Sequence, residues 1–127
     1  MEIPEALRQF GLTENEIKVY LALLDYGPCL AGMISRRTGL HRRTVYDTTA
    51  MLIKKGLIGY ILRNHRRLFQ ASNPQRILDS LKEKENFLLP AVQALTEKFA
   101  KTREKEETNF YKGKEGLKTV FQIQFSA

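Results

Sequence analysis

Apolar positions recur at helical spacing in four stretches near the start of the chain, and a glycine closely follows each stretch. A glycine after the last apolar position commonly ends a helix, because it readily adopts left-handed backbone angles. The pattern therefore predicts four helices. They cover residues 3–10, 13–27, 30–37 and 41–55, and the glycines are Gly11, Gly27, Gly39 and Gly56.

The second predicted helix carries the clearest start signal. Thr13 and Glu16 have the spacing of a capping box, in which a hydroxyl and a carboxylate accept hydrogen bonds from free backbone N–H groups of the first turn. One side of this helix is apolar, so we expect that side to lie in the core. The residues expected there are Ile17, Val19, Tyr20, Leu21, Leu23 and Leu24.

The third and fourth helices are joined by a short turn, which is typical of a helix-turn-helix motif. In the third helix Ala31 and Ile34 are expected to point inward, and Gly39 supplies the positive φ that a sharp turn needs. The fourth helix is the one that such proteins place in the DNA major groove. Its expected packing side consists of Val45, Thr49, Leu52 and Ile53.

The pattern then changes from the helical period to strand-forming runs. Residues 57–62 and 67–71 are rich in strand formers, and Asn64 between them tolerates the left-handed conformation of a tight hairpin. Three helices followed by such a hairpin make a winged helix. We therefore predict a mainly α fold with a small β-hairpin, in which residues 1–72 form a winged helix-turn-helix domain.

A long helix is predicted over residues 73–107, because Asn73 can cap it and Pro74 suits its first turn. Its apolar positions fit a heptad repeat, which favours a dimeric coiled coil over a helix folded back on its own domain. The carboxylate of Glu85 interrupts this seam, and Pro90 falls on its outer side. The expected dimerisation residues are Leu78, Leu81, Leu88, Val92, Leu95 and Phe99.

Residues 108–127 form a tail with mixed signals. We expect a strand and a turn over residues 109–113 and a helix over residues 114–122, the latter from its apolar spacing. A strand, a helix and an apolar end indicate the beginning of a further folded part.

The composition suits a soluble protein. Apolar residues make up 43% of the chain and charged residues 28%, and no apolar run approaches the roughly 18–20 residues of a membrane span. The start lacks the basic and apolar blocks of a secretory signal. Cys29 is the only cysteine, so we expect it to be a small buried side chain in a cytoplasmic, nucleoid-associated protein. Since phosphate-loop, nucleophile and metal-ligand motifs are absent from the sequence, we expect no enzyme and no cofactor.

The positive charge of the chain is concentrated in one stretch. The formal net charge is +7, yet residues 36–67 hold nine lysines and arginines and one acid, Asp47, a local balance of +8. The remaining residues hold 12 basic and 13 acidic side chains, a balance of −1. Such a cationic stretch over a helix-turn-helix and a hairpin predicts a face that binds a polyanion.

Candidate DNA contacts lie at the start of the fourth helix and in the hairpin. Arg42 and Arg43 are the best candidates for base readout, because arginine pairs bidentately with guanine. The wing tip, residues 63–67, is expected on the backbone or in a narrow minor groove. Lys54 and Lys55 are weaker candidates for phosphate contact. The full set is Arg36, Arg37, His41, Arg42, Arg43, Thr44, Tyr46, Asp47, Arg63, His65, Arg66 and Arg67.

Four sequence segments together carry a family resemblance: FGLTENE at 10–16, VYLALL at 19–24 with a following Gly-Pro, RTVYD at 43–47 and KKGLI at 54–58. With them the chain resembles, over about residues 7–105, the N-terminal part of the TrmB-type transcription regulators, which are mostly archaeal. The resemblance implies a dimer that binds promoter DNA. Many members sense sugars through a C-terminal effector domain. We expect neither that domain nor a small-molecule effector in this length of chain.

Two details concern the fit to that family. Residues 110–116 resemble the lead-in to the family's second domain. Thr49 stands where the family usually has an apolar residue, and we expect it to loosen the inner face of the fourth helix slightly.

Three functions fit this sequence. The first is a homodimeric DNA-binding transcription regulator that places the recognition helix, residues 41–55, in the major groove of double-stranded DNA. The second is a non-specific architectural protein that coats DNA. The third is a winged helix that contacts proteins of the transcription machinery. The concentrated charge favours the first two over the third.

Overall fold

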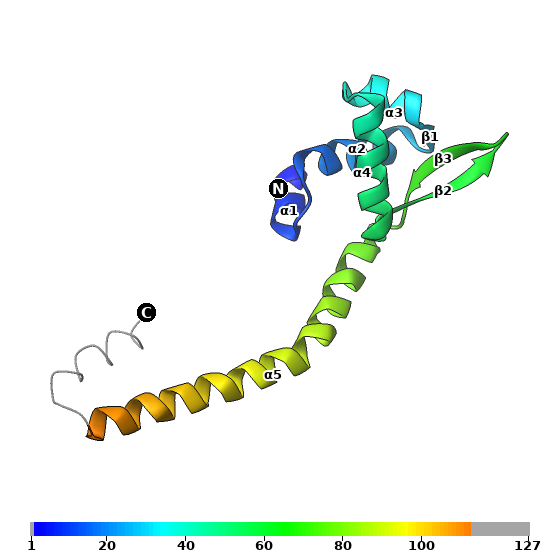
Figure 1. The fold of residues 1–127 in the computed structure, drawn as a ribbon. Helices are drawn as coiled ribbons and strands as arrows, with labels where there is room; N and C mark the ends of the chain where they lie inside the picture. The colour runs from blue at the N-terminus through cyan, green and yellow to red at the C-terminus, as the bar shows by residue number, and fades with distance from the viewer. Residues whose placement is uncertain (1, 113–127) are drawn as a thin grey trace. The chain divides into compact units, whose positions relative to one another are not determined.

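The computed structural model describes residues 2–112 of the chain (Figure 1). The chain divides into two compact units, of which the first ends at Lys82 and the second begins at Glu83. The elements are α1 (Ile3–Phe10), α2 (Glu14–Tyr26), β1 (Cys29–Leu30), α3 (Ala31–Thr38), α4 (Arg42–Lys54), β2 (Ile58–Arg63), β3 (Arg66–Ala71) and α5 (Gln75–Lys112).

The four predicted helices of the first unit form at the places that their end signals indicate. At the start of α2 the Thr13 Oγ1 atom accepts a hydrogen bond from the backbone N–H of Glu16 at 3.2 Å, and a Glu16 carboxylate oxygen accepts from the N–H of Thr13 at 3.0 Å. Gly11 and Gly39 have φ of 116° and 77°. Gly11 directly follows α1 and Gly39 directly follows α3, so these two left-handed terminators are confirmed. Gly27 also follows its helix, but with φ of 78° and ψ of −165° it lies outside the left-handed helical region.

The core of the first unit is built from α2, α3, α4 and the sheet, and α1 contributes Leu7 to it. One predicted core residue, Leu24, is 42% exposed instead, and Tyr26 beside it is 55% exposed. The last turn of α2 therefore lies at the edge of the core, and helical spacing cannot show where the covering elements stop. The central buried residues are Ile17, Val19, Tyr20, Leu23, Ile34, Val45, Leu52, Leu57, Ile58 and Phe69.

The sheet has three strands in the order β1-β3-β2, all antiparallel. The two-residue strand β1 was not predicted. Leu30, which was expected to begin the third helix, instead pairs with Leu68 of β3 and serves as the N-cap of α3. The hairpin is tighter than expected, because Arg63 pairs directly with Arg66. Figure 1 shows the β2–β3 hairpin extending from one side of the helices, as a wing does.

The first unit is therefore a winged helix-turn-helix, mainly α with a small sheet, as predicted. The α3–α4 pair forms the helix-turn-helix, and the β2–β3 hairpin, residues 58–71, is called the wing below.

The long helix α5 begins where the sequence indicates. The side-chain oxygen of Asn73 accepts a hydrogen bond from the backbone N–H of Gln75 at 2.9 Å, so Asn73 caps the helix. Ile77 packs against the core of the first unit. Within the described residues, no helix is both long enough and apolar enough to span a bilayer.

In the second unit α5 runs through Pro90 and continues to Lys112. The strand expected from residue 109 is therefore wrong as far as the described residues reach. The preceding run is rich in lysine and glutamate, which favour helix, and Arg103 pairs with Glu107 one turn later at 3.9 Å. The helix expected over residues 114–122 lies outside the described part of the chain.

Candidate nucleic-acid interface

Helix α4 has one buried side and one exposed side. Val45 and Thr49 are buried, whereas Arg42, Arg43 and Tyr46 are exposed. The hydroxyl of Thr49 donates a hydrogen bond to the carbonyl oxygen of Tyr46 at 3.0 Å. A threonine at this buried position is thus accommodated without an unsatisfied hydroxyl. His41 and Asp47 are also exposed, and Thr44 is half-buried.

The turn between α3 and α4 is fixed by side-chain hydrogen bonds. The hydroxyl of Thr38 donates to the carbonyl oxygen of Ile34 at 2.7 Å and accepts from the N–H of Leu40 at 3.3 Å. The hydroxyl of Ser35 donates to the carbonyl oxygen of Leu40. Because these bonds hold both sides of the turn, they set the direction in which α4 leaves α3.

The C-terminal end of α4 is anchored by an ion pair with α2. The ammonium of Lys55 lies 2.6 Å from the Glu16 carboxylate, whose side chain is 5% exposed, and 3.4 Å from the carbonyl oxygen of Gly11. Lys55 was a weaker candidate for phosphate contact. Its ammonium is instead held by these contacts with Glu16 and Gly11. Its neighbour Lys54 is exposed.

The two arginines at the end of α3 have different surroundings. Arg37 lies over the ring of Tyr26, with 4.1 Å between the guanidinium carbon and the ring centroid. Arg36 is exposed on a different side and lines a cavity between α3, α4 and the wing. The two adjacent arginines therefore differ: Arg37 contacts an aromatic ring, and Arg36 lines the cavity.

The wing carries four exposed cationic candidates. Its turn consists of Asn64 and His65, with φ of 51° and 63°, as a two-residue turn of type I′ requires. The guanidinium of Arg67 lies over the ring of Tyr60, 4.8 Å from the centroid. The cationic residues are Arg63, His65, Arg66 and Arg67, and Arg63 and Arg66 also border a smaller hollow of about 350 Å³.

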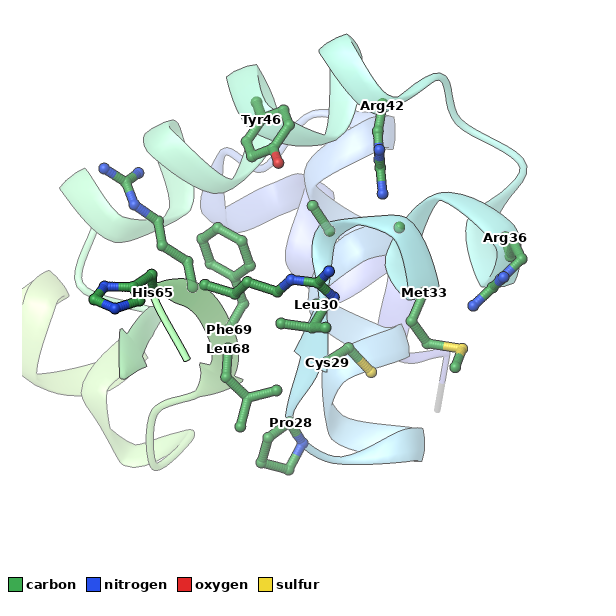
Figure 2. A pocket seen from close by; sticks show the side chains of 14 residues that line it. Pro28, Cys29, Leu30, Met33, Arg36, Arg42, Tyr46, His65, Leu68 and Phe69 are labelled. Carbon is green, nitrogen blue, oxygen red and sulfur yellow. The ribbon is translucent and has the colours of Figure 1, made fainter. Parts of the chain in front are cut away.

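The cavity between α3, α4 and the wing has a volume of about 740 Å³. Figure 2 shows Arg42 reaching from α4 toward α3, with the Tyr46 hydroxyl turned toward the same space. No carboxylate is among the described residues that line it. The lining residues are Pro28, Cys29, Leu30, Ala31, Gly32, Met33, Arg36, Arg42, Tyr46, His65, Arg66, Arg67, Leu68 and Phe69.

This cavity brings together only part of the predicted set. Six candidates line it: Arg36, Arg42, Tyr46, His65, Arg66 and Arg67. The other six, Arg37, His41, Arg43, Thr44, Asp47 and Arg63, lie outside its lining.

Sequence reasoning missed two residues of this region. Gly32 lies against Arg42, and Tyr60 supports Arg67. The Tyr60 contact was accessible in principle, because Arg67 is paired with Leu62 and Tyr60 lies two positions further along the same face of the hairpin. Nothing in the sequence pattern signals the approach of Arg42 to Gly32.

The only cysteine of the chain lies at the wall of the cavity as a buried side chain. Burial raises the pKa of the Cys29 thiol, and the nearby charge of Arg37 opposes that rise. The thiol donates to the carbonyl oxygen of Gly27 at 3.2 Å. A protonated, hydrogen-bonded thiol is a poor nucleophile, in keeping with a packing role.

The predicted dimerisation residues are all substantially exposed in the single chain. Leu78 and Leu81 of the first unit are 58% and 46% exposed. In the second unit Leu88, Val92, Leu95 and Phe99 are 50–62% exposed. Two further apolar side chains, Phe87 and Leu89, are 84% and 54% exposed and lie off the heptad seam.

Comparison with protein families gives one clear match. The family model described as "Sugar-specific transcriptional regulator TrmB" matches residues 7–75. The HTH-type sugar sensing transcriptional regulator TrmBL1 of Pyrococcus furiosus is 34% identical over 82 residues, which are 65% of this chain and 24% of that protein. The chain thus spans about a quarter of the length of this relative.

Solved structures show the same fold. A transcriptional regulator of Thermotoga maritima has a TM-score of 0.52 at 20% identity, over 97% of this chain and 85% of that one. MepR, a transcription regulator of the Staphylococcus aureus multidrug efflux pump MepA, has a TM-score of 0.52 at 15% identity, over 85% and 84%. A MarR family protein from Bacillus stearothermophilus has a TM-score of 0.50 at 18% identity, over 83% and 81%.

Proposed function

This chain belongs to the TrmB family of transcriptional regulators, and we propose that it binds specific sites on double-stranded DNA as a homodimer. In this proposal residues 1–72 contact DNA, and the helix from residue 73 joins two copies of the chain. The tail from residue 108 is the beginning of a further folded part. Helix α4 enters the major groove, and the wing lies on the backbone or in the minor groove.

The observation that carries the proposal is the charge around the helix-turn-helix. Residues 36–67 have a local balance of +8, and the cavity between α3, α4 and the wing is lined by four arginines without a described carboxylate. A concentrated cationic surface next to an exposed recognition helix matches the phosphate backbone beside a major groove.

The roles proposed within the surface follow from position. The exposed first turns of α4 reach base edges, and Arg43 and Asp47 in these turns lie outside the cavity lining. The wing residues Arg63, His65, Arg66 and Arg67 follow the backbone or enter a narrow groove. The remaining proposed contacts are Arg36, Arg37, His41, Arg42, Thr44 and Tyr46.

The proposed dimer uses the apolar seam of α5. A water-exposed row of leucine, valine and phenylalanine at heptad spacing is favourable only when a second helix covers it. A two-fold dimer binds an inverted repeat, with half-sites separated by one helical turn, roughly 34–36 Å, or a multiple of it.

Selection of bound sequences from random duplexes tests this proposal. We expect a palindromic motif with half-sites one or two turns apart. Uniform, cooperative coverage of every duplex would instead support an architectural protein. Failure to bind any duplex, with retained binding to transcription proteins after charge reversal at Arg42 and Arg43, would support a protein-contact module.

A further inference from the structure

We infer that the cavity between α3, α4 and the wing binds a phosphate group, with Arg42 as its main contact, and that Arg43 rather than Arg42 reads bases. This inference rests on the proposed function and deepens it, because it assigns different roles to two adjacent arginines that the sequence cannot distinguish.

The position of Arg42 is the first argument. A Cβ atom built on Gly32 would lie 2.6 Å from one terminal nitrogen of the Arg42 guanidinium, 3.6 Å from its central carbon and 3.7 Å from Nε. The guanidinium therefore lies close to the backbone of α3 at Gly32, and a side chain at that position would have to displace it. Figure 2 shows this reach from α4 across to α3.

In that position Arg42 does not extend from the side of α4 that would face the DNA groove. A base-reading arginine extends from the outer side of the recognition helix toward base edges. Both arginines are exposed, but Arg42 lines the cavity and Arg43 lies outside its lining. Two consecutive residues lie about 100° apart around a helix, so one can face the cavity while the other faces the groove.

The charge of the cavity is the second argument. Arg36, Arg42, Arg66 and Arg67 line it together with His65. In the part of the chain that the structure describes, no carboxylate forms a salt bridge with any of these four arginines. Like charges that converge without a counter-charge repel one another, and a bound anion relieves that repulsion.

The lining also suits the geometry of phosphate. Guanidinium groups present paired N–H donors that match two phosphate oxygens, and the Tyr46 hydroxyl faces the same space. Leu30 and Phe69 give the cavity an apolar floor. Charge-assisted hydrogen bonds are stronger beside such apolar walls than in open water.

The phosphate has two possible sources, the DNA backbone and a free phosphate ester. Both share the chemistry that the cavity recognises. The location between the recognition helix and the wing favours the backbone, because a DNA strand that passes from one to the other crosses this position. The experiment separates the two sources.

The first arm compares Arg42→Ala with Arg43→Ala in selection from random duplexes. For Arg42→Ala we expect the wild-type motif, a uniform loss of affinity for every duplex and a salt slope smaller by about 2, since each copy of the dimer loses one phosphate contact. For Arg43→Ala we expect relaxed preference at one position of each half-site. A motif that changes at a base position in Arg42→Ala would overturn the inference.

The second arm uses Gly32→Ala, whose methyl group displaces the guanidinium. Alanine favours a helix more than glycine does, so we expect a higher melting temperature together with weaker DNA binding. In the Arg42→Ala background the same substitution should no longer weaken binding. Equal losses in both backgrounds would show that Gly32 acts independently of Arg42, which contradicts the inference.

The third arm titrates the free protein with inorganic phosphate, using chloride at matched ionic strength as the control. We expect the amide resonance of Gly32 to shift with phosphate in the wild type and to remain unchanged in Arg42→Ala. A shift that persists in Arg42→Ala, or is equally large with chloride, would overturn the inference. This arm needs no DNA. A cavity that does not bind phosphate can therefore be distinguished from a protein that does not bind DNA.

The same phosphate additions, made during DNA binding, identify the source. Loss of bound DNA beyond the chloride effect in the wild type but not in Arg42→Ala would show that DNA and free phosphate occupy the same cavity, and would assign the cavity to the backbone phosphodiester. Retention of DNA at phosphate concentrations that shift the Gly32 resonance would instead assign the cavity to a free phosphate ester that binds alongside DNA. Equal competition in both proteins would contradict the assignment to the cavity.

Discussion

At the residue scale, Lys55 illustrates how a basic side chain can serve the fold rather than a ligand. Its ammonium lies 2.6 Å from the buried carboxylate of Glu16, which also accepts the capping hydrogen bond from Thr13. One carboxylate thus connects the start of α2 with the end of α4. The contact determines where the recognition helix ends relative to the core.

Replacing Lys55 by methionine should destabilise the first unit. The substitution leaves the Glu16 carboxylate, 5% exposed, with only its capping hydrogen bond. We expect a loss of about 2–3 kcal/mol in the free energy of unfolding, somewhat less than for a fully buried pair because Lys55 is 28% exposed. Urea denaturation of the wild type and the variant measures this loss.

The exposed neighbour Lys54 provides the matched control. Lys54→Met changes the same charge at the same end of α4, but at an exposed position. We expect an effect within about 0.5 kcal/mol. Equal effects of the two substitutions would refute the structural role of Lys55.

Tyr20 presents the opposite case, a buried polar group without compensation. Its side chain is 2% exposed, and its hydroxyl has no hydrogen-bond partner among the described residues. Tyr20→Phe should therefore raise the free energy of unfolding by about 1 kcal/mol at pH 7, because an unsatisfied hydroxyl no longer has to be desolvated.

The same residue makes a pH-dependent prediction. Burial raises the pKa of Tyr20 above its usual value of about 10. Above that pH the unfolded phenol loses its proton while the folded one retains it, so the stability of the wild type falls as pH rises. Urea denaturation at about pH 7 and pH 10.5 should show an advantage of Tyr20→Phe that grows with pH. An advantage that shrinks would contradict the buried, protonated phenol.

Single residues also mark the limit of what the sequence predicts. The spacing of apolar positions identifies a helix face, but not whether another element covers it, and for this reason the exposure of Leu24 was missed. In the same way, the sequence places Arg42 and Arg43 side by side. Only the packing of α3 against α4, with Gly32 at the contact, distinguishes their surroundings.

At the element scale, helices were predicted better than strands. The capping box and the glycines Gly11 and Gly39 act within a few residues, so their signals are present in the local sequence. Strand β1 has only two residues and exists because Cys29 and Leu30 pair with β3, almost 40 positions away. Such a strand depends on the tertiary fold and leaves no local pattern.

The proposed seam of α5 can be tested with a double substitution. Leu88→Glu/Leu95→Glu places two carboxylates on the heptad seam, and burial of each against a second helix should cost several kcal/mol. We expect light scattering to give the mass of a dimer for the wild type and of a monomer for the variant.

Phe87 supplies the control for the seam. It is 84% exposed, the largest exposure among the large apolar side chains described, and it lies off the heptad seam. Phe87→Glu should leave the dimer mass unchanged. A dimer that persists in the double variant, or dissociates in Phe87→Glu, would show that another surface joins the copies.

At the scale of the whole molecule, the excess positive charge and the heptad row of exposed apolar side chains lie on different elements. The cationic residues of 36–67 gather on α3, α4 and the wing, whereas the predicted dimerisation residues lie along α5. The first surface suits a polyanion and the second suits another copy of the chain. This division could be predicted from the sequence, because net charge and heptad spacing are both visible along the chain.

The most direct test of the proposed function measures the dissociation constant for a selected duplex and for a scrambled duplex of equal length, each over a range of salt concentrations. We expect both constants to rise steeply with salt, by about 0.9 log units per log unit of salt for each neutralised phosphate. The selected duplex should bind about a thousandfold or more tightly than the scrambled one throughout. Equal affinity for the two duplexes, or affinity that does not respond to salt, would contradict a sequence-specific, charge-driven DNA-binding function.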